Sequence, residues 1–274
     1  MNLSLSILVF LYKFKIFRRI VPSILRKFYS KKNLQIKINN FQIILNVGSS
    51  IDREIFLKKN YDKDKFDYFE KKINLYEFDY FIDIGSYIGY YSLYLSSKYK
   101  NLKVISFEPI IDSFNLIKES KKVNNFNNIE LNNFALSNIE GKSKFWVTDN
   151  NKKSGYSLFK DDDFKSELKN NNYNYDNLIF QSIETKIFDK KYNINKKKIF
   201  IKIDVERHEF EAILGCKNFL RDSDNLIFLQ VEVVERLEKK VLDLLKSYNF
   251  RQIYRIYPTD KRGGSDFYLT NYNL

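Results

Sequence analysis

The stretch Phe81-Ile82-Asp83-Ile84-Gly85-Ser86-Tyr87-Ile88-Gly89 decides the fold of this 274-residue chain. An apolar run ends in an acidic residue and then passes through two glycines into a helix-like segment, 90–98. Glycine lets the backbone approach a ligand closely, and the first turn of a helix offers free N–H groups to a carboxylate or phosphate. The pattern predicts a nucleotide-type cofactor site. It also fits a turn that needs glycine only for its geometry, and the fingerprint G-x-G-x-x-G is not matched.

Apolar runs bounded by polar turns recur along the chain and alternate with helix-length periodic segments. The expected strands are 79–84, 102–107, 129–134, 199–205 and 226–231, and the expected helices include 90–98, 113–123 and 209–220. Strands that are apolar throughout are buried on both faces, which is typical of a parallel sheet between two layers of helices. The alternation therefore predicts an α/β protein with a Rossmann-like, doubly wound and mainly parallel sheet.

The two ends of the chain and one internal segment depart from this alternation. The strand-like segments 250–257 and 265–270 are joined by a turn-rich linker too short for a crossover helix, which predicts an antiparallel C-terminal hairpin. Residues 141–190, rich in Asn, Lys and Asp, are expected to form an inserted flap with strand pieces at 144–147 and 178–187. A β-like stretch, 34–45, and a polar helical region, 53–72, precede the sheet.

The N-terminal segment, residues 1–30, is expected to be an amphipathic helix attached to a single domain, 31–274. Its apolar residues fall on one helical face, with Pro22 expected to bend or restart the helix. Two interpretations stay open: residues 1–28 lie on the inner face of a membrane, or the helix packs on the domain as a cap. The residues of that face are Phe10, Phe14, Phe17, Val21, Ile24 and Phe28.

Composition excludes several classes of protein. The hydrophobic fraction of 44% and the aromatic fraction of 17% exclude general disorder. The net charge of +13 favours an anionic partner, but its lysines are spread through the chain as pairs and one triplet, so no nucleic-acid partner is expected. Cys216 is the only cysteine and His208 the only histidine, which excludes an intrachain disulfide and a Cys/His zinc cluster and fits a reducing, cytoplasmic setting.

A second acidic residue follows the next expected strand, in Val104-Ile105-Ser106-Phe107-Glu108-Pro109. In a doubly wound sheet this residue, roughly 20 positions after the first turn, lies where it can bind a ribose diol. Two carboxylates at consecutive strand ends favour a cofactor site. The alternative for Glu108 alone is a favourable charge at a helix start, with Pro109 at the first helical position.

The third cluster, 199–209, is a buried strand that runs into Asp204, Glu206, His208 and Glu209. Ligands bind beside the carboxyl ends of strands in open α/β sheets, so a carboxylate or imidazole here is placed to take a proton from an acceptor hydroxyl. We expect Asp204 or Glu206 to be the base, with His208 third. The alternative for His208 is a capping or solvated residue, and for Glu209 a favourable first-turn charge, which is preferred.

Glu232, at the end of the next strand, adds a fourth carboxylate to the same rim. A structural ion pair is an equally supported interpretation of this residue. No metal is expected, although Asp204 and Glu232 are oxygen ligands that need no His or Cys partner.

In combination these motifs resemble the FkbM-type methyltransferases, over about residues 50–245. The resemblance implies a class I methyltransferase fold, for which a parallel sheet closed by an antiparallel hairpin is typical, and S-adenosyl-L-methionine as cofactor. The matching residues are Asp83, Ile84, Gly85 and Gly89, then Phe107 to Pro109, Asn133 to Ser137, Gly141, Lys202 to Glu206, Glu209, Gly215 and Glu232.

The resemblance also implies residue roles. Ser86 and Pro109, which lie next to the motif residues, are predicted to bind the cofactor together with them. Asp83, Gly85 and Gly89 would line the methionine part, Glu108 would hold the ribose, Phe134 and Ala135 would flank the adenine, and Asp204 would face the reacting methyl group. Acceptors in such families are hydroxyls of sugars, glycolipids or similar small molecules, which makes polysaccharide biosynthesis the expected setting.

Two departures from the family pattern bear on activity. Gly85-Ser86-Tyr87 stands where the family usually has Gly-Ala-Asn, and Glu206-Arg207 stands where it usually has Glu-Gly. Tyr87 is expected to bring a bulky ring to the cofactor turn, and Arg207 a Cβ to a position where a permissive residue is usual. The remaining alternatives are a nucleic-acid methyltransferase and a non-catalytic protein with the methyltransferase fold.

Overall fold

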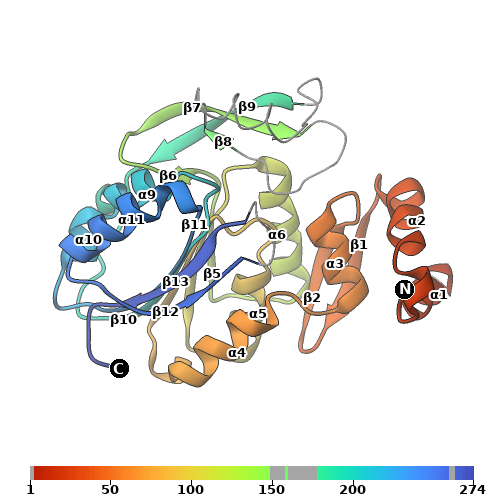
Figure 1. The fold of residues 1–274 in the computed structure, drawn as a ribbon, viewed down its shortest axis with the longest axis horizontal. Coiled ribbons are helices and arrows are strands. Elements are labelled where there is room, and N and C mark those ends of the chain that lie inside the picture. The colour runs from red at the N-terminus through yellow and green to blue at the C-terminus, as the bar shows by residue number, and fades with distance from the viewer. Residues whose placement is uncertain (1–2, 149–157, 160–177, 259–262) are drawn as a thin grey trace.

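The computed structural model describes residues 3–148, 158–159, 178–258 and 263–274, and its centre is a seven-stranded sheet (Figure 1). The strand order is β12-β13-β11-β10-β3-β4-β5, in which β13 alone runs antiparallel to its neighbours. The predicted parallel sheet closed by an antiparallel C-terminal hairpin is confirmed. The strands are β3 (Tyr80–Ile84), β4 (Lys103–Phe107), β5 (Ile129–Asn132), β10 (Lys198–Ile203), β11 (Leu226–Val233), β12 (Arg251–Ile256) and β13 (Ser265–Thr270).

Helices cover both faces of the sheet because the strands are apolar on both sides. Phe81, Phe200 and Phe228 lie side by side at one register and pack in the core beneath α4, α5 and α6. Ile201 and its neighbours on the opposite face pack with Val241 beneath the second helical layer. The first layer is α4 (Lys63–Lys72), α5 (Tyr90–Lys98) and α6 (Ile111–Val123); the second is α8 (Phe188–Lys191), α9 (Glu209–Gly215), α10 (Lys217–Arg221) and α11 (Glu235–Ser247).

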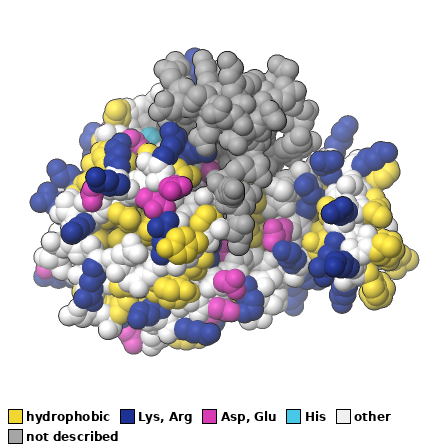
Figure 2. Space-filling model, viewed as in Figure 1, with side chains coloured by type: hydrophobic (Ala, Val, Ile, Leu, Met, Phe, Trp, Pro, Cys, Tyr) yellow, Lys and Arg dark blue, Asp and Glu magenta, His cyan; other side chains and the backbone are white. Residues whose placement is uncertain are grey.

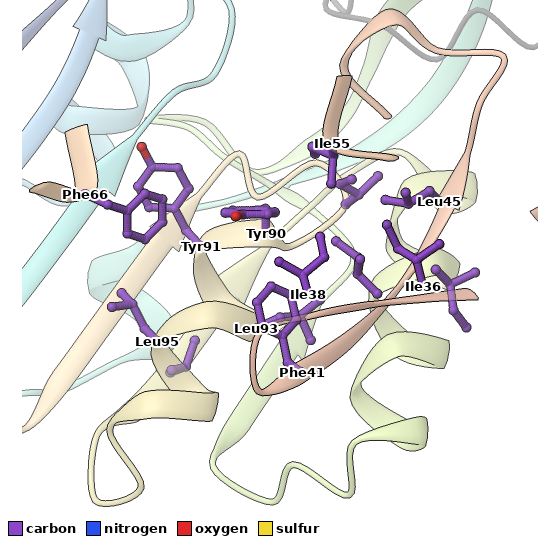
Figure 3. Packing of buried hydrophobic residues seen from close by; sticks show 14 of the residues in the cluster. Ile36, Ile38, Phe41, Leu45, Ile55, Phe66, Tyr90, Tyr91, Leu93 and Leu95 are labelled. Carbon is purple, nitrogen blue, oxygen red and sulfur yellow. The ribbon is translucent and has the colours of Figure 1, made fainter. Parts of the chain in front are cut away.

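An N-terminal hairpin of β1 (Asn33–Ile38) and β2 (Phe41–Asn46) accounts for the β-like stretch before the sheet. Its apolar face packs on α5 together with α3 (Ser50–Lys58), as Figure 3 shows. Two backbone N–H groups on the outer edge of β2 find acceptors at α6. The N–H of Ile44 donates to Ser120 Oγ at 2.9 Å, and the N–H of Gln42 donates to Asn124 Oδ1 at 2.7 Å. The hairpin is therefore anchored to the domain by polar as well as apolar contacts. A short 3₁₀ helix, η2 (Leu75–Glu77), leads into β3.

The N-terminal segment forms two helices where one amphipathic helix was predicted. Helices α1 (Leu3–Tyr12) and α2 (Ile20–Tyr29) are separated by the 3₁₀ turn η1 (Lys15–Phe17), so the chain restarts before Pro22. The predicted face is divided: Val21 is buried while Phe10 and Phe28 are exposed. Across the described residues, no helix has both the length and the apolar character needed to cross a membrane.

A second, four-stranded sheet of order β6-β9-β7-β8 begins three residues after β5 ends (Figure 1). Its strands are β6 (Ala135–Leu136), β7 (Gly141–Thr148), β8 (Leu158–Phe159) and β9 (Leu178–Lys186). The strand piece expected at 144–147 lies within β7, and the one expected at 178–187 matches β9 to within one residue. Residues 149–157 and 160–177 of the expected flap lie outside the described residues.

Candidate active site

Five polar side chains form a row across the sheet. This row lies two residues nearer to the carboxyl ends of the parallel strands than Phe81, Phe200 and Phe228, and on the same face. Strand pairing aligns Ser106, Asp83, Lys202, Gln230 and Tyr268 at one register, so all five point to the face covered by α4 and α5. All are buried. Ser106 Oγ, Asp83 Oδ1, Gln230 Oε1 and the Tyr268 hydroxyl have no hydrogen-bond partner within the described structure. Buried polar groups with unfilled bonding capacity can be satisfied by a bound ligand or by ordered water.

Asp83 and Lys202 form the charged centre of this row. Asp83 Oδ2 accepts a hydrogen bond from Ser92 Oγ of α5 at 2.6 Å, and burial raises the pKa of this carboxyl while Lys202 partly opposes the rise. Lys202 Nζ donates to Asp204 Oδ2 at 2.9 Å and lies 4.9 Å from the centre of the Tyr91 ring. Although burial disfavours its charge, Asp204 and Asp83 together raise the pKa of Lys202.

The glycine turn brings the ends of β3 and β10 into contact. Gly85 has φ +83°, and a Cβ on it would lie 1.9 Å from the carbonyl oxygen of Asp204. The N–H of Asp204 in turn donates to the carbonyl of Ile84 at 3.0 Å, so Asp83 and Asp204 are held near each other. The N–H of Ser86 donates to the carbonyl of Phe107 at 3.0 Å, which fixes the turn against the end of β4. Gly85 is required both for its backbone angle and for this close approach.

The Tyr87 ring does not fill the turn as expected. Its hydroxyl contacts Ser49 Oγ and Asp52 Oδ1, each at 2.7 Å, in the loop and first turn of α3. Its N–H donates to Glu108 Oε2 at 2.8 Å. Tyr87 therefore fastens the turn to the N-terminal hairpin region and directs its bulk toward that region.

Glu108 is buried between the turn and the start of α6. Oε2 accepts from the N–H of Tyr87, and Oε1 accepts from that of Ile110 at 2.8 Å. Burial raises the pKa of this carboxyl to about 8, against the two backbone donors that lower it. Each oxygen retains a lone pair that can accept from a ribose hydroxyl. Pro109 precedes the helix N-cap at Ile110, so the alternative that placed it at the first helical position is wrong.

The two residues expected beside an adenine lie in different environments. Phe134 is buried with its ring edge-on to Phe107 at 5.5 Å, in the core of the second helical layer. Ala135, in β6, belongs to a small apolar cluster with Ile110, the residue that Glu108 caps. Ala135 therefore packs with the residue that Glu108 caps, whereas Phe134 packs on Phe107, the residue before Glu108.

The segment after β10 contains the predicted bases and an unusual backbone. Glu206 and Arg207 both have left-handed φ angles, +52° and +75°, so Arg207 occupies a conformation that favours glycine. Burial opposes ionisation of Asp204, but Lys202 and Lys65 outweigh it and lower its pKa. Desolvation at the crowded strand end, together with neighbouring carboxylates, raises the pKa of Glu206 well above its usual range, although the side chain keeps an exposed surface.

His208 and Glu209 are committed to structural contacts at the start of α9. His208 is buried with Nε2 3.0 Å from Ser137 Oγ, and burial lowers its pKa to about 4. His208 is the N-cap residue of α9, but its side chain makes no capping hydrogen bond and is buried against Ser137, so it is neither the capping nor the solvated residue of the alternative interpretation. Glu209 Oε1 accepts from the N–H of Arg207 at 2.8 Å, and burial raises its pKa to about 8. Gly215 is required nearby, because a Cβ would lie 2.2 Å from the Ser137 carbonyl oxygen.

No motif in the sequence predicted that α4 contributes to this site. Lys65 Nζ lies 2.7 Å from Asp266 Oδ2, 3.3 Å from Glu232 Oε2 and 3.6 Å from Asp62 Oδ2. Burial disfavours the ammonium form, but these carboxylates raise the pKa of Lys65 well above its usual value. Tyr91 also donates to Asp62 Oδ2 at 3.1 Å. In the sequence, Asp62 and Lys65 look like part of an ordinary solvated helix, with alternating charges and no glycine or strand end to mark them.

Glu232 lies at the carboxyl end of β11, beside Lys65, and has a shifted pKa. Burial raises its pKa to about 7, with Asp204 adding to the rise and Lys65 opposing it. Gly264 packs directly on it, since a Cβ there would lie 2.9 Å from Glu232 Cγ. The expected ion pair of Glu232 exists, with Lys65 as its partner, and it leaves the carboxylate partly exposed.

Comparisons with known proteins identify the family of this chain. The family model described as "Methyltransferase FkbM domain" matches residues 83–252, more than half of the chain. Solved structures with a similar fold include the methyltransferase FkbM from Methylobacillus flagellatus KT (15% identity, TM-score 0.47), which covers 70% of this chain; this chain covers 44% of that one. Another is M. jannaschii TYW2 in complex with AdoMet (12% identity, TM-score 0.43, covering 87% of this chain and 83% of that one).

A third similar structure is Trm5b from Pyrococcus abyssi, at 10% identity and a TM-score of 0.45, with 88% of this chain and 56% of that one covered. A search of curated proteins gave no significant match. The family match includes the glycine turn and the ends of β4, β10 and β11, and it excludes α4. On the extent of that match, this chain belongs to the FkbM methyltransferase domain family.

Proposed function

We propose that this protein is an S-adenosyl-L-methionine-dependent O-methyltransferase that acts on a hydroxyl of a sugar, glycan, glycolipid or similar small acceptor. The residues present fit the cofactor by their chemistry. Asp83 has a buried, unpartnered carboxylate oxygen suited to an ammonium group, and Glu108 keeps acceptor capacity for a ribose diol. When bound, the cofactor supplies an electrophilic methyl group on a sulfonium.

The observation that carries the acceptor assignment is the carboxylate cluster around Lys65. Asp62, Glu232 and Asp266 surround Lys65, and Asp204 adds its charge from the end of β10. Carboxylates accept hydrogen bonds from hydroxyls, whereas they repel phosphates. A polyhydroxylated acceptor is therefore favoured over a nucleic-acid strand, whose backbone needs lysine and arginine contacts.

Among the carboxylates at this rim, we assign Glu232 as the base that removes the hydroxyl proton, in place of Asp204 or Glu206, which the sequence predicted. A base works best when its pKa lies near the working pH, which the pKa of about 7 satisfies. Asp204 is held ionised by Lys202 and is a weaker base, so it is assigned to orienting the acceptor. Lys65 balances the negative charge that Glu232 carries before it takes the proton.

Calorimetry with S-adenosyl-L-methionine tests the first half of the proposal. We expect the wild-type chain to bind, and Asp83→Asn to bind at least tenfold more weakly, because an amide cannot compensate the ammonium charge. Ser247→Ala, on the far end of α11, is the control. The absence of binding at millimolar cofactor would leave a non-catalytic methyltransferase fold.

Transfer of a labelled methyl group to candidate acceptors tests the second half. We expect product with hydroxylated sugars or glycolipid extracts and none with RNA. If the labelled methyl group appeared on RNA and not on a glycan, the proposed acceptor class would be rejected, while the cofactor assignment would stand.

A further inference from the structure

Positive charge is concentrated at the N-terminus of the chain. Residues 1–51 contain nine of the 47 lysines and arginines and none of the 34 acidic residues; the first carboxylate is Asp52. This segment therefore carries +9 of the formal net charge of +13. The rest of the chain, including the carboxylate cluster around Lys65, is close to balanced.

The same segment concentrates exposed apolar side chains. Helices α1 and α2 bury one side against the domain, with Val21 and Leu25 almost fully buried, and leave the other side in solvent. Seven of the fourteen exposed large hydrophobic residues among the described ranges belong to it, with exposures from 49% to 76%. They are Leu3, Ile7, Phe10, Phe14, Ile16, Ile20 and Phe28.

Basic and apolar groups alternate within this surface. Lys13, Lys15, Arg18 and Arg19, all exposed, flank Phe14 and Ile16 in the connection between the helices. Figure 2 shows hydrophobic side chains gathered at the edge of the molecule where Figure 1 places α1 and α2, with lysine and arginine side chains beside them. This combination is typical of an element that lies on a membrane surface. Its apolar side chains enter the boundary of the acyl chains, and its basic side chains contact anionic headgroups.

We propose that the surface formed by residues 3–28 docks this protein on a bilayer that contains anionic phospholipid. Charge complementarity selects anionic lipid, because every charged side chain of residues 3–28 is positive. A nucleic acid would pair with the lysines and arginines but would leave the leucine, isoleucine and phenylalanine side chains in water, so it accounts for half of the surface only. The docking site is separate from the site of methyl transfer and does not depend on the proposed activity.

Docking through these helices would hold the whole domain at the membrane. Ser4 Oγ lies 3.0 Å from the Tyr29 hydroxyl, which ties α1 to the end of α2. The buried residues of both helices belong to the same core as the N-terminal hairpin and α5. The surface is therefore part of the folded domain, and substitutions on its exposed side leave that core intact.

Vesicle flotation of the full-length protein tests the proposal. We expect binding to vesicles of equal parts phosphatidylcholine and phosphatidylglycerol, at least tenfold weaker binding to phosphatidylcholine alone, and loss of binding at high salt. The combined change Phe10→Ser, Phe14→Ser and Ile16→Ser should lower binding by at least tenfold. Its matched control changes three side chains of comparable exposure elsewhere: Tyr76→Ser, Ile139→Ser and Tyr257→Ser.

A second pair of variants separates local docking from overall charge. Changing Lys13, Lys15, Arg18 and Arg19 to Gln removes the same charge as changing Lys118, Lys122, Lys217 and Lys239 to Gln. We expect only the first set to release the protein from anionic vesicles. Equal effects of the two sets, or no binding of wild type to either vesicle, would overturn the proposal.

Two further results would assign the surface to a different partner and reject the membrane. One is RNA binding that needs the four basic side chains of the first set but is unaffected by the serine changes. The other is a wild-type dimer in sedimentation that the serine changes convert to a monomer while vesicle binding is unchanged.

Discussion

Arg207 occupies a backbone conformation that costs free energy for any residue with a Cβ. Its φ of +75° follows the left-handed φ of Glu206, at the point where β10 leads into α9. Arg207→Gly is expected to have a free energy of unfolding about 1 kcal/mol higher than that of Arg207→Ala, because only glycine removes the strain. Urea unfolding of the two variants measures the difference, and equal midpoints would show that the strain is absorbed elsewhere.

Glu232 should control the pH dependence of methyl transfer. Its carboxylate must be ionised to act as a base, so activity is expected to rise with pH through about 7 and then level off. Glu232→Gln should lower kcat roughly 100-fold and remove this rise. Asp204→Asn should reduce activity and keep a rise with pH, but move it below pH 7, because the charge of Asp204 contributes to the raised pKa of Glu232. A wild-type profile that is flat between pH 6 and 8 would remove Glu232 from the role.

Helix α4 links the N-terminal half of the domain to the chemistry at the end of β11. Replacement of Lys65 by Met removes the cation 3.3 Å from Glu232 and should raise the pKa of that carboxyl. The rise in activity with pH is then expected to move above pH 7, while Lys65→Arg should keep it in place. A lower rate with an unmoved pH profile would indicate that Lys65 serves only to dock the helix.

In the turn between β3 and α5, Gly85 has no room for a side chain. Gly85→Ala should lower the free energy of unfolding by roughly 3 kcal/mol or more, because its Cβ would collide with the backbone of Asp204. Gly141→Ala is the matched control, since Gly141 also has a positive φ but has open space around it. We expect about 1–2 kcal/mol there from the backbone angle alone. Thermal melting distinguishes the two, and similar losses would rule out the contact as the cause.

At the scale of the whole molecule, buried carboxyls should make stability fall as pH rises from about 4.5 to about 8. Glu108 and Glu209 have pKa values of about 8 in the folded protein against 4.5 as model groups, so the folded state binds more protons between these values. Their stabilisation is complete below pH 4.5 and is lost as pH rises through 8. His208, lowered from 6.5 to about 4, works in the opposite direction up to pH 6.5.

Between pH 6.5 and 8 these two glutamates are therefore unopposed by His208, and the loss is about 1.4 kcal/mol per pH unit for each at its steepest. Glu108→Gln and Glu209→Gln should each flatten the fall, because glutamine does not ionise. Urea unfolding of the ligand-free protein at pH 6.5 and pH 8 measures it. A stability that rises over this interval would show that these carboxyls ionise freely in the folded state.

The sequence by itself determined the central sheet and three of the carboxylates at its edge. Apolar runs and glycine turns are local signals, so the segments now seen as β3, β10 and β11 could be placed within a residue or two, and α5 was placed over its observed range. Asp83, Glu108 and Asp204 lie at strand ends because a parallel α/β sheet gathers the carboxyl ends of its strands at one edge. The short linker before β13 was enough to predict the hairpin.

Only the tertiary structure decided which side chains complete the site. Lys65 meets Glu232 and Asp266 across more than 160 residues of chain, and no local pattern encodes such a contact. The same holds for Tyr87, whose ring turned toward Asp52, and for His208, whose environment is set by Ser137. Burial and partner charges, which decide the pKa of a group, depend on packing between distant segments and thus appear only once the chain is folded.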